Sequence, residues 1–401
     1  MELAVVCWQV NDPRNDSEVP SMTNKLLRGG ITLVALSGAF CVCVMRVPGG
    51  DVQAADKPAV TTSGWNPTAA AHYLDSRETW WQGWGRAQKD HGTLCVSCHT
   101  QASYALARPM LRSRAGERAP TTQEQVMLAS VEKRVRDWKD VQPFYSDAVS
   151  GAGKEVESRN AESVLNAFIL DCYDSPQGHL SERTRMAFDN AWALQSKTGP
   201  DAGAWVWQNF DYTPWESKES QYHWAALVAL AVGAAPDRYM NDQKIAVNLD
   251  LLRSYLRSHY DAQPLVNKMV AMWASSYLPG VLTLDQMHAL VDDVDALQHK
   301  DGGWSLTDLG TWKRRDGTPL ETRSDGYATG LAVLVLKESP VTSDKKPHVA
   351  RGLAWLETNQ DKTTGSWPAW SLNKNRDPKS DAGMFMSDAA TSYAVLALED
   401  R

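Results

Sequence analysis

The amino-acid sequence predicts an all-α protein in which helical hairpins form a closed double ring. Two observations carry this prediction: two kinds of helical segment alternate along the chain, and one unit recurs. Residues 331–336 are apolar on nearly every side, and a helix of that kind must be buried. Residues 284–297 indicate an amphipathic helix, because their apolar positions are spaced by three and four: Met287, Leu290, Val291, Val294 and Leu297. We therefore expect amphipathic outer helices and apolar inner helices.

Such pairs of segments occur six times in the 401 residues, which are 43% hydrophobic and so can fill a large core. The expected outer helices are residues 68–88, 122–138, 181–196, 242–258, 285–298 and 347–359. The expected inner helices are residues 100–113, 159–172, 219–233, 264–277, 326–337 and 387–399. Six hairpins with apolar inner helices indicate one ring, so we assign residues 55–401 to a single domain.

The repeat is clearest in two apolar segments, because residues 328–336 align with residues 390–398. Each follows a turn that begins with Gln and ends with Trp, at 298–304 and 360–367, and an earlier copy runs from 195 to 205. Glycine in these turns supplies the left-handed residue that ends the outer helix, and we expect Trp304 and Trp367 to be structural plugs. The stretch Gln298–Trp304 resembles the repeat of squalene and terpenoid cyclases and prenyltransferases. This resemblance is strongest over residues 180–401 and implies an α/α toroid.

The N-terminus is typical of a secretory signal peptide. Lys25 and Arg28 precede the apolar residues 31–45, and small residues up to Ala54 offer a cleavage site. We predict a leader over residues 1–54, with Met22 as an alternative start, and a mature protein in the periplasm or cell envelope. An apolar run of fifteen residues is short for a bilayer, which needs about 20, so we expect no stable span in the mature chain; an uncleaved anchor is the alternative.

Removal of the leader takes Cys7, Cys41 and Cys43 with it and leaves three cysteines. Cys172 lies in an apolar helix, where a buried thiol is the expected role. The other two belong to Cys95-Val96-Ser97-Cys98-His99, the pattern of covalent attachment of a c-type haem, with His99 as the iron ligand. Because the motif precedes an expected inner helix, it is predicted to lie in a hairpin loop. The combination resembles a bacterial group of cytochrome c-like toroid proteins.

The sixth iron ligand is left open by the sequence. The candidates are histidine and methionine side chains with no other evident role: His72, His91, Met110, His179, His223, Met384 and Met386. A firmly bound sixth ligand favours electron transfer, and an open position permits chemistry on peroxide or a substrate.

The sequence gives weaker support to other functions. The net charge of −7 gives no reason to expect nucleic acid. Asp292, Asp293 and Asp295 do not have the order of the acidic stretch with which cyclases start their reaction, so we expect no squalene cyclase activity and a solvated acidic face. Acids that could serve carbohydrate chemistry are Glu155, Glu157, Glu162 and Glu216.

The sequence therefore predicts an exported haem c protein that transfers electrons to or from a redox partner. A haem-dependent peroxidase or oxidase, and a module that binds an isoprenoid or glycan, are the alternatives; whether it is an enzyme stays open. We expect the turns from outer to inner helix to share one end of the ring. The haem is expected at this mouth, near Arg159 and some of the residues that these turns carry: Trp205, Trp207, Trp215, Glu216, Trp304, Trp312, Arg314, Arg315, Trp367 and Trp370.

Overall fold

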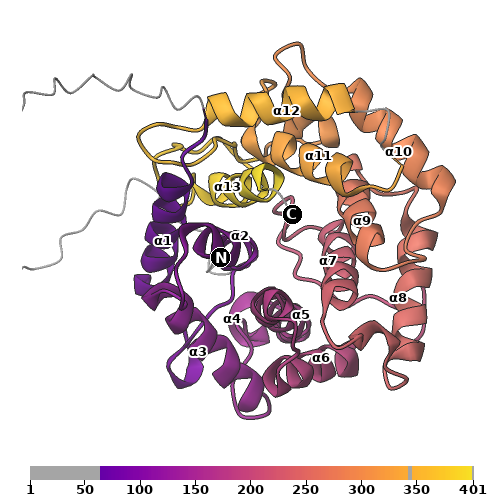
Figure 1. Ribbon diagram of the computed structural model, residues 1–401. Helices are drawn as coiled ribbons and strands as arrows, with labels where there is room; N and C mark the ends of the chain where they lie inside the picture. The colour runs from indigo at the N-terminus through magenta and orange to yellow at the C-terminus, as the bar shows by residue number, and fades with distance from the viewer. Residues whose placement is uncertain (1–63, 342–345, 400–401) are drawn as a thin grey trace, which may run out of the picture. The chain divides into compact units, whose positions relative to one another are not determined.

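A computed structural model describes residues 64–341 and 346–399 of the chain. Within these residues six helical hairpins form a closed ring, with the hairpins following one another around it in chain order (Figure 1). The outer helices are α1 (Pro67–Gly83), α3 (Thr122–Arg136), α6 (Glu182–Leu194), α8 (Ala246–His259), α10 (Leu284–Ala296) and α12 (Lys346–Asn359). The inner helices are α2 (Gln101–Ala115), α5 (Lys154–Asp174), α7 (Ser220–Ala234), α9 (Leu265–Tyr277), α11 (Gly326–Glu338) and α13 (Phe385–Leu398).

Short elements occupy the connections. The turn between α1 and α2 holds two short antiparallel strands, β1 (Gln88–Lys89) and β2 (Thr93–Leu94), which flank the 3₁₀ turn η1 (Asp90–Gly92). The helix α4 (Asp147–Ser150) precedes α5. The remaining 3₁₀ turns are η2 (Ser175–Gln177), η3 (Tyr239–Asn241) and η4 (Leu306–Leu309). The predicted fold class, an all-α α/α toroid of six hairpins, is thus confirmed.

The inner layer is closed because each inner helix packs on the next, and α13 packs on α2. Helices α7, α11 and α13 are buried along almost their whole length, as their apolar sequences predict. Two inner helices lie very close at Gly330, where a Cβ atom would come within 2.6 Å of the backbone of α13. Only glycine lets α11 and α13 approach this closely.

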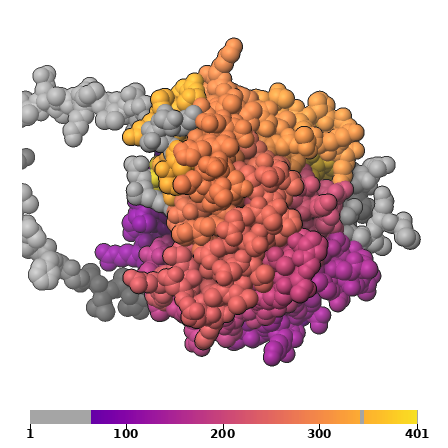
Figure 2. All heavy atoms as spheres, turned by 90° about the vertical axis from the view of Figure 1, so that its right-hand side faces the viewer, coloured from indigo at the N-terminus to yellow at the C-terminus, as the bar shows by residue number. Residues whose placement is uncertain are grey.

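The outer helices present one apolar face to this layer and a polar face to solvent. On α10 the buried residues are Met287, Leu290, Val291 and Val294, which are those of the predicted stripe. Helices α3 and α10 begin with capping boxes at Thr121 and Thr283, which satisfy the first backbone N–H groups. A side view shows the outer wall of the ring where α8 and α10 run (Figure 2).

The tryptophans of the repeat are plugs, as predicted. Each indole N–H donates to a carbonyl of the preceding outer helix near its C-terminal end, at distances of 2.6, 2.7 and 2.8 Å. The pairs are Trp205 with Ala191, Trp304 with Val294 and Trp367 with Leu356. The three indoles are at most 2% exposed. Each therefore fills the end of its hairpin and satisfies a helix-terminal carbonyl.

The glutamine and glycine of the repeat join each hairpin to the next outer helix. Gln360 Nε2 donates to the carbonyls of Gly365 and of Asn66, the residue that caps α1. Gly365 has φ +83°, and a Cβ atom there would lie 2.3 Å from the carbonyl oxygen of Ala69 in α1. The equivalent pairs Gln195 with Gly203 and Gln298 with Gly302 make the same contacts with α8 and α12. The last copy of the repeat thus closes the ring onto its first helix.

The predicted leader, its cleavage near Ala54 and the alternative start at Met22 lie outside the described residues, as does the boundary of the domain at residue 55. Within the described part of the chain, no helix combines the length and apolarity that a membrane span requires.

Candidate functional site at the mouth of the ring

The long turns from outer to inner helices meet at one end of the ring, which we call the mouth. They comprise residues 84–100, 137–153, 195–219, 297–325 and 360–384. Arg315 joins three of them, because its guanidinium donates to the carbonyls of Phe210 and Asp211 and its backbone N–H donates to the carbonyl of Asn373. Asn373 Nδ2 in turn donates to the carbonyl of Thr213 at 2.9 Å. The mouth is therefore a connected surface built from turns far apart in the sequence.

The motif at Cys95, Cys98 and His99 lies at this mouth, between β2 and α2, as its place in the sequence predicted. The backbone N–H of Cys95 donates to the carbonyl of Ala87 at 2.7 Å, and its carbonyl accepts from Trp81 Nε1 at 2.8 Å. Both cysteines are thiols with 5% and 7% of their surface exposed, and His99 is 2% exposed. The three side chains are thus held inside the ring.

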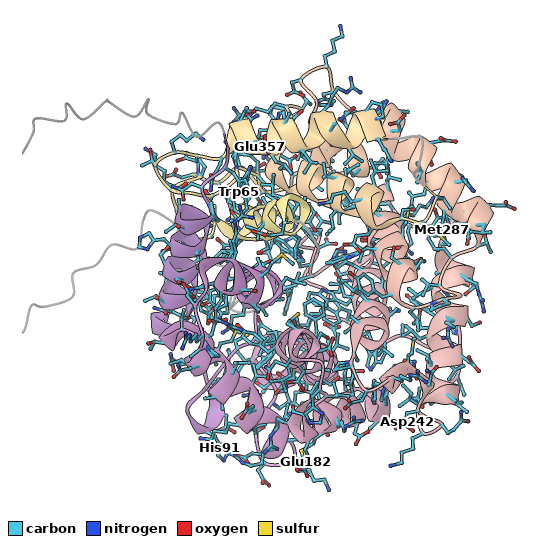
Figure 3. The ribbon with its side chains drawn as sticks, viewed as in Figure 1. Trp65, His91, Glu182, Asp242, Met287 and Glu357 are labelled. Atoms are coloured by element: carbon cyan, nitrogen blue, oxygen red, sulfur yellow. The ribbon has the colours of Figure 1, made fainter. Side chains whose placement is uncertain are left out.

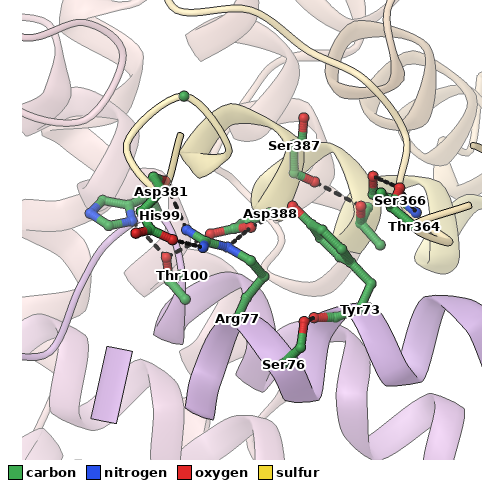
Figure 4. A network of polar contacts seen from close by, with 12 residues as sticks. Tyr73, Ser76, Arg77, His99, Thr100, Thr364, Ser366, Asp381, Ser387 and Asp388 are labelled. Atoms are coloured by element: carbon green, nitrogen blue, oxygen red, sulfur yellow. Dashed lines mark hydrogen bonds and ion pairs between the residues drawn. The ribbon is translucent and has the colours of Figure 1, made fainter. Parts of the chain in front are cut away.

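A chain of hydrogen bonds fixes the tautomer of His99 (Figure 4). The Thr100 hydroxyl donates to Asp388 Oδ2 at 2.7 Å, so its single proton is used there. Its oxygen, 2.8 Å from His99 Nδ1, must then accept from an Nδ1–H group. Nε2 is consequently the acceptor nitrogen. Burial, followed by the nearby cations Arg77 and Arg376, holds the pKa of His99 well below its usual range, so the ring is neutral at pH 7.

Asp388 is the centre of this network. Its Oδ1 accepts from the Tyr73 hydroxyl at 2.7 Å and from Arg77 Nε at 2.8 Å. The guanidinium of Arg77 also pairs with Asp381 at 3.1 Å. Because Tyr73 and Arg77 belong to α1, Thr100 precedes α2 and Asp388 lies in the first turn of α13, the network ties the first hairpin to the last.

Aromatic rings pack around His99. Its imidazole lies against Phe385 with 3.7 Å between ring centroids, and Trp81 and Trp215 follow at 5.2 and 5.9 Å. The Nε2 nitrogen has the protonation of a metal ligand. Among the residues that the structure describes, no group of three or more His, Cys, Asp and Glu side chains could hold a metal ion.

The predicted function as an electron-transfer protein of the cytochrome class, with iron and haem, is therefore wrong, and the redox partner predicted with it has no support. Of the residues expected around the haem, Trp215 lies beside His99, whereas Arg159 stacks on Trp138 at 4.6 Å and Trp207 stacks on Trp224 at 4.9 Å. Covalent attachment at Cys95 and Cys98 stays a prediction, which the mass of the peptide carrying both cysteines measures directly.

The candidates for a sixth ligand are scattered. His72, His91 and His179 are exposed, and His91, at the periphery near α3 (Figure 3), pairs with Asp90. His223 is buried in α7, where its Nδ1 lies 3.2 Å from Asn267 Oδ1. The methionines divide between the two ends of the ring: Met110 lines a cavity at the far end, whereas Met384 and Met386 flank Phe385 beside His99.

The acids considered for carbohydrate chemistry are partnered within the fold. Glu162 forms a buried ion pair with Arg134, and Glu157 pairs with Lys154. Glu155 accepts from the backbone N–H of Asp147. Glu216 is 3% exposed and pairs through its backbone with Tyr212.

The acidic stretch of α10 behaves as predicted. Asp292 and Asp293 are exposed on the outer wall, and Asp295 forms an ion pair with His348. None of the three faces the inside of the ring.

Trp312, one of the aromatic residues predicted for the mouth, lines two cavities. One has a volume of about 450 Å³ and includes Glu219, Gln263 and Asp308 in its lining. The other has a volume of about 150 Å³ and is lined by Asp211, Thr213, Thr311, Lys313, Arg315 and Asn373 together with Trp312. Of these, only Trp312, Arg315 and the general position of the turns were predicted. Gln263 and Asn373 carry no distinguishing signal in the sequence.

The Trp312 indole is held in position by its neighbours. Its N–H donates to the carbonyl of Leu306 at 3.0 Å. A Cβ atom at Gly310 would lie 2.3 Å from the ring, so the glycine lets the chain pass directly against the indole. Other predicted mouth residues have structural contacts: Trp370 stacks under Arg323 at 3.9 Å, and Arg314 is buried against the carbonyl of Ser371.

Comparison with solved structures finds similar chains. The chain is similar to a GH76A α-1,6-mannanase from Salegentibacter sp. HEL1_6, with 12% identity and a TM-score of 0.49 over 83% of this chain and 100% of that one. It is also similar to an inactive variant of that enzyme in complex with α-1,6-mannotetrose, with 11% identity, a TM-score of 0.48 and the same coverage. No protein-family model and no curated protein matches the sequence.

Proposed function

We propose that this protein binds a glycan at the mouth of the ring, with Trp312 as the stacking platform. The supporting observation is the indole shared by two polar cavities. A sugar has an apolar C–H face that suits an aromatic ring and hydroxyl groups that need donors and acceptors on either side. Glu219, Gln263 and Asn373 are polar groups of this kind in the two linings.

The polarity of the site separates this proposal from the isoprenoid alternative. Ligand sites for apolar molecules are lined mainly by hydrophobic side chains, whereas both cavities beside Trp312 carry charged and amide groups. The resemblance to terpenoid cyclases therefore concerns the fold and not the ligand. Export to the cell envelope is part of the proposal, and mass spectrometry of the natural N-terminus tests it.

The binding test is calorimetric titration with α-1,6-mannotetraose and with oligosaccharides of other linkages and sugars. Trp312→Ala should weaken binding of the recognised glycan about tenfold or more, because the stacking surface is lost. Trp138→Ala is the matched control, since it removes a half-buried indole from a different turn. The proposal fails if the wild-type protein binds no glycan, or if both variants bind as the wild type does.

Hydrolysis of the bound glycan is a second candidate, because the larger cavity carries two carboxylates, Glu219 and Asp308. Glycosidases use such a pair, one as acid and the other as nucleophile or base. Asp308 Oδ2 lies 2.8 Å from His299 Nε2, which orients it. Release of reducing ends by the wild type, its loss in Glu219→Gln and unchanged binding by that variant would establish catalysis. No release by the wild type leaves a binding protein.

A further inference from the structure

A further cavity lies at the opposite end of the ring from the mouth. It has a volume of about 450 Å³ and is lined by the C-terminal halves of five inner helices: α2, α5, α7, α9 and α13. This volume falls within the range of about 300–1,000 Å³ that is usual for small-molecule sites. Most of the lining is apolar: Leu106, Pro109, Met110, Phe168, Pro176, Leu230, Ala231, Ala234, Trp273 and Leu396.

Two buried polar atoms in this lining have no hydrogen-bond partner among the described residues. They are Oδ1 of Asp171 in α5 and the indole N–H of Trp273 in α9. The two side chains belong to residues that are 3% and 2% exposed. A buried polar atom without a partner is costly, so each indicates a group that is satisfied when the cavity is occupied.

The charge of the lining limits the class of ligand. No Lys, Arg or His lies among its residues, so an anionic head group would find no cation there. Burial raises the pKa of Asp171 to about 8; a hydrogen bond with the Ser175 side chain opposes this increase, and the nearby Asp174 adds to it. The Asp171 carboxyl is therefore predominantly neutral at pH 7 and does not attract a cationic ligand either.

We propose that this cavity binds a neutral aliphatic alcohol, with the chain among the apolar side chains and the hydroxyl hydrogen-bonded to Asp171. A hydroxyl suits the site because it both donates and accepts. Trp273 supplies a further donor in the same lining. The site is independent of the mouth, so its failure leaves the glycan proposal untouched.

The test uses 1-decanol as the probe and decanoate as its charged counterpart of equal chain length. Calorimetric titration of the full chain at pH 7 should show saturable binding of 1-decanol and at least tenfold weaker binding of decanoate. Absence of decanol binding, or equal affinity for decanoate, overturns the proposal.

Two sets of variants locate the bound probe. Ala234→Phe places a large ring at the half-buried rim of the cavity and should abolish binding, whereas Ala129→Phe on the exposed face of α3 should not. Asp171→Asn keeps an acceptor oxygen and should bind within about threefold of the wild type, while Asp171→Leu should bind about tenfold more weakly. If Ala234→Phe does not fold, the Asp171 pair decides. Equal affinities of the Asn and Leu variants contradict the hydrogen bond, and wild-type affinity in Ala234→Phe contradicts the site.

Discussion

Replacing Asp388 by alanine should weaken the contact between the first and last hairpins that closes the ring. The carboxylate is 0% exposed and accepts from three side chains that belong to the first hairpin: Tyr73, Arg77 and Thr100. In the Ala variant these donors lose their acceptor, and water has little access to replace it. The substitution therefore acts on the contact between α13 and the helices α1 and α2, not on the interior of one helix.

The magnitude follows mainly from Arg77, whose side chain is 4% exposed. Removing one partner of a buried ion pair costs about 3–5 kcal/mol. The lost bond from the Tyr73 hydroxyl adds about 1 kcal/mol. Asp381 still pairs with Arg77, but its side chain is 41% exposed and compensates only in part. We expect the free energy of unfolding to fall by about 4 kcal/mol, a large part of the 5–15 kcal/mol that is usual for a domain.

Urea denaturation followed by circular dichroism measures this difference. Asp381→Ala is the control, because it removes the exposed partner of the same arginine and should cost about 1 kcal/mol or less. Tyr73→Phe removes a single donor and should cost about 1 kcal/mol. A loss below 1 kcal/mol for Asp388→Ala, or equal losses for the two aspartates, would refute the assignment of ring closure to this network.

Two further predictions concern stability. Burial lowers the pKa of His223 to about 4, so below pH 6.5 the unfolded chain takes up a proton that the native state does not. The free energy of unfolding should therefore fall by about 3 kcal/mol between pH 6.5 and 4. Denaturation curves of His223→Gln should lack this part of the pH dependence. Gly365→Ala should lower the melting temperature more than Gly317→Ala. Both glycines have positive φ, but only Gly365 lies against the backbone of α1, whereas nothing lies within 4 Å of a Cβ at Gly317. Equal effects would show that the close approach is not tight.

The architecture could be predicted because it depends on the local periodicity of the apolar residues. The stripe of residues 284–297 and the apolar segment 331–336 each indicate one helix and its layer, and repetition of the pair indicates a ring. The contacts that close the ring could not be predicted in the same way. Thr100 and Asp388 are separated by 288 residues, and neither differs in its sequence surroundings from other polar residues at helix starts.

The site was harder to predict, for two different reasons. The Cys95–His99 motif is a strong local signal for an attachment chemistry, but its pattern carries no information on the aromatic rings that pack against His99 in the fold. Trp312 was expected at the mouth together with nine other residues. What distinguishes Trp312 from the plugs at Trp304 and Trp367 is the turn around it, in which Gly310 lies against the indole.

The repeat itself explains why the two ends of the ring suit different ligands. Every inner helix starts at the mouth, so the long turns with their polar side chains gather there and can vary without disturbing the core. At the opposite end the inner helices converge with mainly apolar residues, and Asp171 is the one acid in the lining of the cavity there. We therefore propose a glycan at one end of this scaffold and an aliphatic alcohol at the other.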